Sequence, residues 1–176
     1  MSNRDHAEND AERPGVRRFE ELSPPQVMAL AIDIERANAR RFRAFADVFG
    51  GYDEQVAKRL VELADEEDAH ELTLVQTFQE NFEGPIPSVE ENNVDVVIEA
   101  FDLVDSEQQI FDSLDPIRVY ELALRAERMA RGFYLRAARA CDEPKLVDVY
   151  RQLASMEDDH VGWFEEKIRS GKESAK

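Results

Sequence analysis

Apolar side chains recur at spacings of three and four residues in four long stretches of the chain. This spacing places them along one face of an α-helix, as in antiparallel helical bundles. Start and stop signals bound the stretches: Ser23 with the prolines after it opens the first, and Gly50-Gly51 closes it. The pattern therefore predicts an all-α chain, with helices from Ser23 to about Phe49, over 53–82, from Pro116 to about Ala140, and from Pro144 to about Arg169.

The four apolar stripes form an internal repeat. A shift of 92 residues carries the first stripe onto the third, and a shift of 90 carries the second onto the fourth. The centre of every stripe is a glutamate, and the second and fourth stripes add a histidine one turn later: Glu35, Glu67, His70, Glu127, Glu157 and His160. The repeat predicts two helical hairpins related by a pseudo-two-fold axis.

A long connection over 83–115 separates the two hairpins. A helix of about 26 residues is roughly 39 Å long, and an extended connection of this length reaches about 100 Å. The connection can therefore cross the whole bundle, which makes the second and third helices parallel. We expect a short helix over 94–104 on this crossover. Residues 1–19 and 171–176 are polar and lack a period, so we expect flexible tails around one domain over 20–170.

Composition excludes several classes of protein. A formal net charge of -17 disfavours a nucleic-acid partner, because phosphate binding needs a basic surface. No apolar run approaches the roughly 20 residues that span a membrane, and the N-terminus lacks the apolar core of a signal peptide. The single cysteine, Cys141, excludes an internal disulfide or a multi-cysteine metal site and is consistent with the cytoplasm.

Four glutamates on apolar stripes require an explanation, because a buried and unpaired carboxylate costs several kcal/mol or takes up a proton. Three explanations compete: a misassigned helix face that lies in water, a polar layer in which Glu and His bind one another, and a metal site. One Glu-x-x-His pattern is weak in a glutamate-rich chain. Two copies at equivalent places in repeated stripes, each matched by a single core glutamate, favour metal.

The spacing also predicts how the ligands divide between two ions. Residues three apart lie on one helical face, so Glu and His can meet the same ion. Four carboxylates balance two divalent cations, which favours two ions over one. We expect Glu67 and Glu157 to bridge both ions, Glu35 and His70 to complete one, and Glu127 and His160 to complete the other. Oxygen-rich sites with one imidazole per ion suit Fe or Mn, whereas Zn would bind without redox chemistry.

Three further side chains are candidates to support these ligands. Tyr134 lies two turns beyond Glu127, and either donates a hydrogen bond to a ligand carboxylate or is a core aromatic residue; Phe42 is its repeat equivalent. Asp68 and Asp158 follow the expected bridging glutamates. They either hold the free ring nitrogen of the opposite histidine or occupy exposed helix positions.

The motifs resemble those of the rubrerythrin branch of the ferritin-like superfamily, from about Phe19 to Ser170. The resemblance lies in the segments 31–35, 67–70, 124–127 with 133–134, and 157–160. It implies a ferritin-like bundle with a di-iron site that oxidises Fe(II) or reduces H2O2 or O2. It also suggests a homodimer, which is the commonest symmetric assembly.

Two departures from the family limit what the resemblance implies. The chain has no rubredoxin domain with paired cysteines to deliver electrons, so the electron donor is external and unidentified. Ala130 stands where rubrerythrins carry an extra glutamate, which makes the ligand set more like that of bacterioferritins. The functional hypotheses are a redox enzyme, a metal buffer or iron-delivery protein that binds without turnover, and a structural bundle with a Glu–His polar layer.

Overall fold

The computed structural model describes residues 18–51, 53–89 and 116–174, and helices account for most of them. The elements in chain order are the 3-10 turn η1 (Phe19–Glu21) and the helices α1 (Pro24–Phe49), α2 (Glu54–Asn81), α4 (Pro116–Ala140) and α5 (Pro144–Ser174). No strand occurs in these ranges, so the predicted all-α bundle is confirmed. The short helix expected over 94–104 lies outside the described residues.

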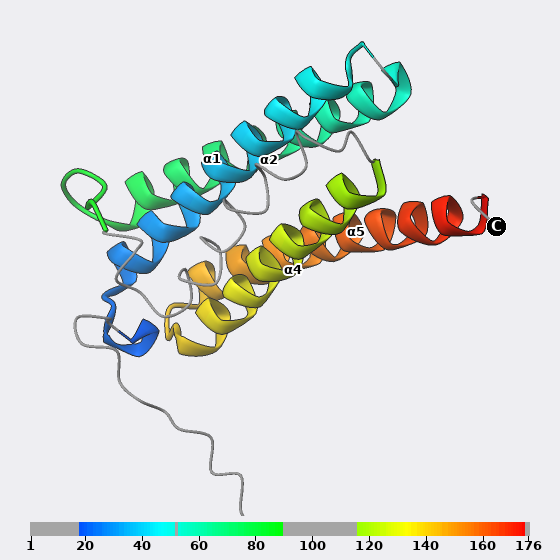
Figure 1. Cartoon of the computed structure of the whole chain (residues 1–176). Helices are drawn as coiled ribbons and strands as arrows, with labels where there is room; N and C mark the ends of the chain where they lie inside the picture. The colour runs from blue at the N-terminus through cyan, green and yellow to red at the C-terminus, as the bar shows by residue number, and fades with distance from the viewer. Residues whose placement is uncertain (1–17, 52, 90–115, 175–176) are drawn as a thin grey trace, which may run out of the picture.

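The helices pack as two hairpins, with α1 along α2 and α4 along α5. Figure 1 shows α1 and α5 running in one direction and α2 and α4 in the other. Both hairpins are therefore antiparallel, while α2 and α4 are parallel, as the length of the crossover predicted.

Local signals fix where the helices begin and end. The Asp53 side chain accepts hydrogen bonds from the backbone N–H groups of Gln55 and Val56, at 3.1 Å each, and so caps α2. At the start of α1, the Ser23 backbone N–H donates to Gln26 Oε1 at 3.1 Å. After α2 the chain turns at Gly84, whose φ of 87° is accessible mainly to glycine.

Two predicted boundaries are wrong. The last helix was expected to end near Arg169, but α5 continues through Gly171 to Ser174. Gly171 lies against α4 so closely that a Cβ atom there would stand 2.2 Å from Ile117 Cδ1, so this glycine serves helix packing rather than termination. Phe19, assigned to the tail, is buried and packs edge-to-face on Phe133 with ring centroids 5.7 Å apart.

The interior contains two separate apolar clusters. One lies towards the η1 end of the bundle and includes Met28, Phe78 and Tyr150. The other lies towards the α1–α2 turn and includes Phe45 and Phe164. The central glutamates and histidines of the stripes belong to neither cluster. They occupy the region of each helix between the two clusters.

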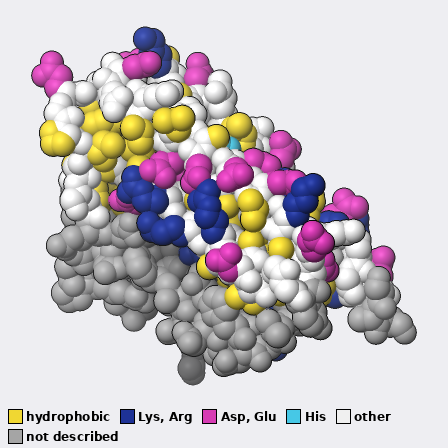
Figure 2. Space-filling view, turned by 90° about the horizontal axis from the view of Figure 1, so that it is seen from above, with side chains coloured by type: hydrophobic (Ala, Val, Ile, Leu, Met, Phe, Trp, Pro, Cys, Tyr) yellow, Lys and Arg dark blue, Asp and Glu magenta, His cyan; other side chains and the backbone are white. Residues whose placement is uncertain are grey.

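Charged pairs connect the helices of each hairpin at the surface. Arg36 binds Asp33 on its own helix and Glu71 on α2, and Arg128 on α4 binds Glu165 on α5. Figure 2 shows basic and acidic side chains side by side across one face of the bundle. Such exposed pairs each contribute little to stability, so the hairpins depend mainly on their buried faces.

Candidate metal centre

The structure brings all six residues from the centres of the predicted stripes into one buried layer. All have exposed fractions of 5% or less. Their ligand atoms form two overlapping groups, each with all its atoms within 4.8 Å of one another. Both groups contain Glu67 and Glu157; the first adds Glu35 and His70, and the second adds Glu127 and His160. This division matches the expected pair of sites, and it excludes the explanation that these residues lie in water.

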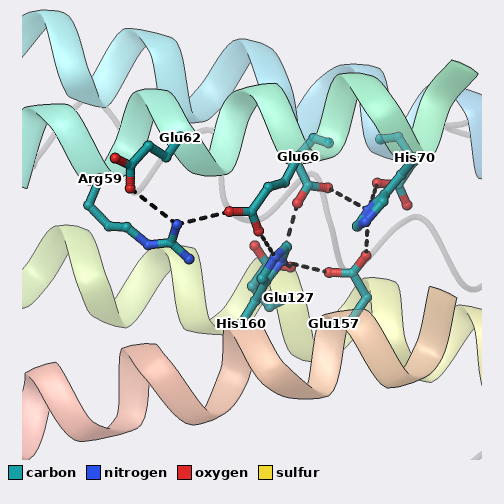
Figure 3. Close-up of polar contacts among 9 residues, drawn as sticks. Arg59, Glu62, Glu66, His70, Glu127, Glu157 and His160 are labelled. Carbon is teal, nitrogen blue, oxygen red and sulfur yellow. Dashed lines mark hydrogen bonds and ion pairs between the residues drawn. The ribbon is translucent and has the colours of Figure 1, made fainter. Parts of the chain in front are cut away.

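Both histidines present the same ring nitrogen to the carboxylates. His70 Nδ1 lies 3.3 Å from Glu35 Oε2 and 3.4 Å from Glu157 Oε1. His160 Nδ1 lies 3.3 Å from Glu67 Oε1 and 3.4 Å from Glu157 Oε2. The two rings are nearly parallel, with centroids 5.9 Å apart. Figure 3 shows the histidines entering the site from α2 and α5 beside the glutamates.

Most of these polar atoms lack a hydrogen-bond partner. In the described part of the chain, eight buried side-chain nitrogen and oxygen atoms have none, and seven of them belong to this layer. They are both carboxylate oxygens of Glu67, Glu127 and Glu157, together with His160 Nδ1. Buried polar groups are nearly always hydrogen-bonded, so the contacts between glutamates and histidines alone leave many atoms of the layer unsatisfied. Converging carboxylate oxygens and an imidazole nitrogen without hydrogen-bond partners are the kind of donor set that a divalent cation requires.

The pKa values of Glu35, Glu127 and His70 are shifted when the layer contains no metal. Burial raises the pKa of Glu35 and Glu127 well above the ordinary value, and the charges of Glu157 and Glu67 add to the rise. Burial alone would lower the pKa of His70, but contacts with Glu157 and Glu35 raise it to about 10. His70 therefore holds a proton at neutral pH, and a metal ion that binds this imidazole would displace that proton.

Tyr134 contacts the layer directly. Its hydroxyl donates a hydrogen bond to Glu35 Oε1, and the side chain is fully buried. Of the two interpretations of this tyrosine, the structure supports the hydrogen bond to a candidate ligand. The donor comes from α4 and the acceptor from α1, so the bond joins the two hairpins. The repeat-equivalent Phe42 has no hydroxyl to donate.

Asp68 and Asp158 do not hold the ring nitrogens of the histidines, so that interpretation of the two residues is wrong. Asp68 forms an ion pair with Arg43 on α1, and Asp158 binds Arg131 Nε on α4 at 2.8 Å. Both aspartates lie on the exposed face of their helices, as the alternative interpretation stated. A residue directly after a buried helix position points about 100° away from it, which turns both carboxylates out of the layer.

Sequence reasoning missed Glu66. This carboxylate accepts from His160 Nε2 at 2.8 Å through Oε2, and it binds Arg59 at 2.9 Å through Oε1. It therefore holds the ring nitrogen that faces away from the layer. One signal was available in the repeat: the position equivalent to Glu66 is Met156, so the two halves differ here.

Comparison with known proteins adds the fold and nothing finer. No protein-family model matches the chain, and no curated protein matches it. A hypothetical protein from Pyrococcus furiosus has a similar structure, with a TM-score of 0.63 and 20% identity over 86% of this chain and 91% of its own. None of the helices in the described ranges is long and apolar enough to span a membrane.

Proposed function

We propose that this chain is a two-metal carboxylate protein of the ferritin-like kind that oxidises Fe(II), reduces H2O2 or O2, or does both. The observation that supports this most is the set of seven buried ligand atoms without hydrogen-bond partners. They come from α2, α4 and α5, and together with Glu35 and His70 these residues form two overlapping groups of donors. Four carboxylates balance two divalent cations, and Fe or Mn suits these ligands.

Each residue of the site has a defined role in this proposal. Glu67 and Glu157 belong to both donor groups and would bridge the ions. Glu35 with His70, and Glu127 with His160, would complete the two ligand sets. Two iron ions would supply the electrons for the reaction. The protein orients the ligands through Tyr134 and Glu66 and encloses them between two apolar clusters that exclude water.

The resemblance to rubrerythrins and bacterioferritins supports the redox class, since it rests on the same six positions. We also propose a homodimer and an external electron donor, neither of which bears on the site's geometry. A metal buffer that binds two ions and stops is the competing function, and turnover separates it from the redox protein.

The test is metal content followed by turnover. The purified full chain should bind two Fe(II) ions anaerobically, and addition of O2 or H2O2 should then oxidise them to ferric iron, followed by ultraviolet absorbance. Further Fe(II), or ascorbate as an external reductant, should then allow repeated cycles. Glu67→Ala and Glu157→Ala should abolish binding and oxidation, while the surface control Glu165→Ala should change neither. Equal oxidation rates in all four proteins would overturn the proposal, and binding without turnover would establish the buffer instead.

A further inference from the structure

Glu66 is fixed at both of its carboxylate oxygens. Oε2 contacts His160 Nε2 at 2.8 Å, and Oε1 accepts from Arg59 at 2.9 Å. Arg59 is itself held in place, because its guanidinium lies over the Trp163 ring at 5.3 Å and also contacts Glu62 at 3.4 Å. Figure 3 shows this chain of contacts running from Arg59 through Glu66 to His160. It joins α2 to α5 beside the site.

The contact determines what His160 offers to a metal. An imidazole that donates its Nε2 hydrogen to a carboxylate keeps Nδ1 as a lone pair, and the carboxylate raises the basicity of that nitrogen. His160 Nδ1 is the atom that faces Glu67, Glu127 and Glu157. Glu66 therefore sets both the orientation and the donor strength of this ligand.

The other half of the repeat lacks every part of this arrangement. A shift of 90 residues carries Arg59 onto Val149 and Glu66 onto Met156. The Met156 side chain is 47% exposed, and a thioether is a weak acceptor. His70 thus has no carboxylate in the position that Glu66 occupies for His160.

A second difference between the two halves also favours metal binding at the His160 group of ligands. Tyr134 donates to Glu35, which belongs to the His70 group of ligands. The hydrogen bond occupies one lone pair of that carboxylate and so weakens it as a donor to metal. Its counterpart in the other group, Glu127, has no such partner among the described residues, because Phe42 stands at the equivalent position.

We infer that Glu66 is a positioning residue that makes the two metal positions unequal, so that the first divalent cation binds at Glu67, Glu127, Glu157 and His160. The second then binds at Glu35, Glu67, His70 and Glu157. This inference rests on the proposed function, since it concerns the same pair of metals. Removing a carboxylate that holds a ligand histidine typically lowers metal affinity about 10-fold to 100-fold. Glu66 is partly exposed, so we expect the lower end of that range.

Calorimetric titration of the metal-free full chain with Co2+ tests the inference. The wild type should bind two ions in two resolved steps. Glu66→Met, which copies the residue of the other half, should weaken the tighter step about 10-fold, and Glu66→Gln should restore part of the loss because its amide oxygen still accepts. Met156→Glu should strengthen the weaker step. Circular dichroism checks that the variants remain folded.

Three further variants make the result specific. Glu62→Gln removes the same charge beside Arg59 without touching His160, so both steps should stay unchanged. His160→Ala should remove the tighter step, and His70→Ala should remove the weaker one. Loss of the tighter step in His70→Ala, or identical isotherms for wild type and Glu66→Met, would overturn the inference and leave the proposed function standing. A wild-type chain that binds no Co2+ would overturn both.

Discussion

The hydrogen bond between Tyr134 and Glu35 is formed in the interior and links α4 to α1. Removing the donor of a buried hydrogen bond leaves its carboxyl acceptor unsatisfied. The loss typically lowers the free energy of unfolding by about 1–3 kcal/mol. Tyr134→Phe should therefore lower the free energy of unfolding of the metal-free protein by about this amount, as measured by urea denaturation. The same substitution in a Glu35→Ala background, which has no acceptor for the tyrosine, should cost less, and an equal cost in both backgrounds would count against the bond.

In the proposed metal site, protons and metal ions would compete for the same residues. The pKa of His70 is raised to about 10 in the metal-free protein, so this imidazole holds a proton at neutral pH, and the carboxyl groups of Glu35 and Glu127, whose pKa values are raised by burial, give up their protons less readily than usual. Metal binding must release those protons, and metal affinity should therefore rise as pH rises from about 6 to 8. Calorimetry in two buffers of different ionisation enthalpy measures the release. Identical binding enthalpies in both buffers would contradict this expectation.

The repeat made the candidate ligands predictable from the sequence. The glutamates stand at equivalent positions in the two hairpins, and both copies also contain a histidine, a residue that is rare in this chain. This pattern identifies the central layer without knowledge of any contact. Glu66 was not predictable in the same way, because its role depends on which residue of a different helix it faces. In a chain with 39 acidic residues, one more glutamate beside a core position is ordinary, and the difference from Met156 in the repeat does not reveal the contact with His160.

At the scale of the helix, Asp53 is the cap on which the start of α2 depends. Its carboxylate satisfies two backbone N–H groups of the first turn, those of Gln55 and Val56. Asp53→Ala should therefore destabilise the protein by about 1 kcal/mol. Asp53→Asn should retain most of the stability, since an amide oxygen also caps. Thermal unfolding measures both, and a full loss in the asparagine variant would show that charge rather than capping is responsible.

Helix starts and periodic faces were read correctly from local residues, whereas the two errors arose from tertiary contacts. Gly171 resembles a stop signal in the sequence, yet in the fold it allows α5 to lie against Ile117. Phe19 follows a charged stretch with no period, and only its contact with Phe133 shows that it belongs to the core. Neither partner can be identified from the spacing of residues along a single helix.

At the scale of the whole molecule, the two hairpins share one set of ligands. Glu67 comes from α2 and Glu157 from α5, and both belong to each donor group. Metal should therefore stabilise the folded chain: at 100 times the dissociation constant, the gain is about 2.7 kcal/mol. For a chain of this size the melting temperature should rise by roughly 5–10 °C, and a chelator should reverse the rise. Glu157→Gln should show little response to metal.

The layer of glutamates and histidines lies between two apolar clusters that share no buried residue. Apolar contacts are the main source of cooperativity in a core, so an interrupted core divides the bundle into two regions that can open separately. In the metal-free chain, backbone amides near Phe78 and those near Phe45 should then exchange with deuterium at rates set by different opening free energies. Two ions bound between the clusters would couple them, and the slowest amides at both ends would converge on a single rate.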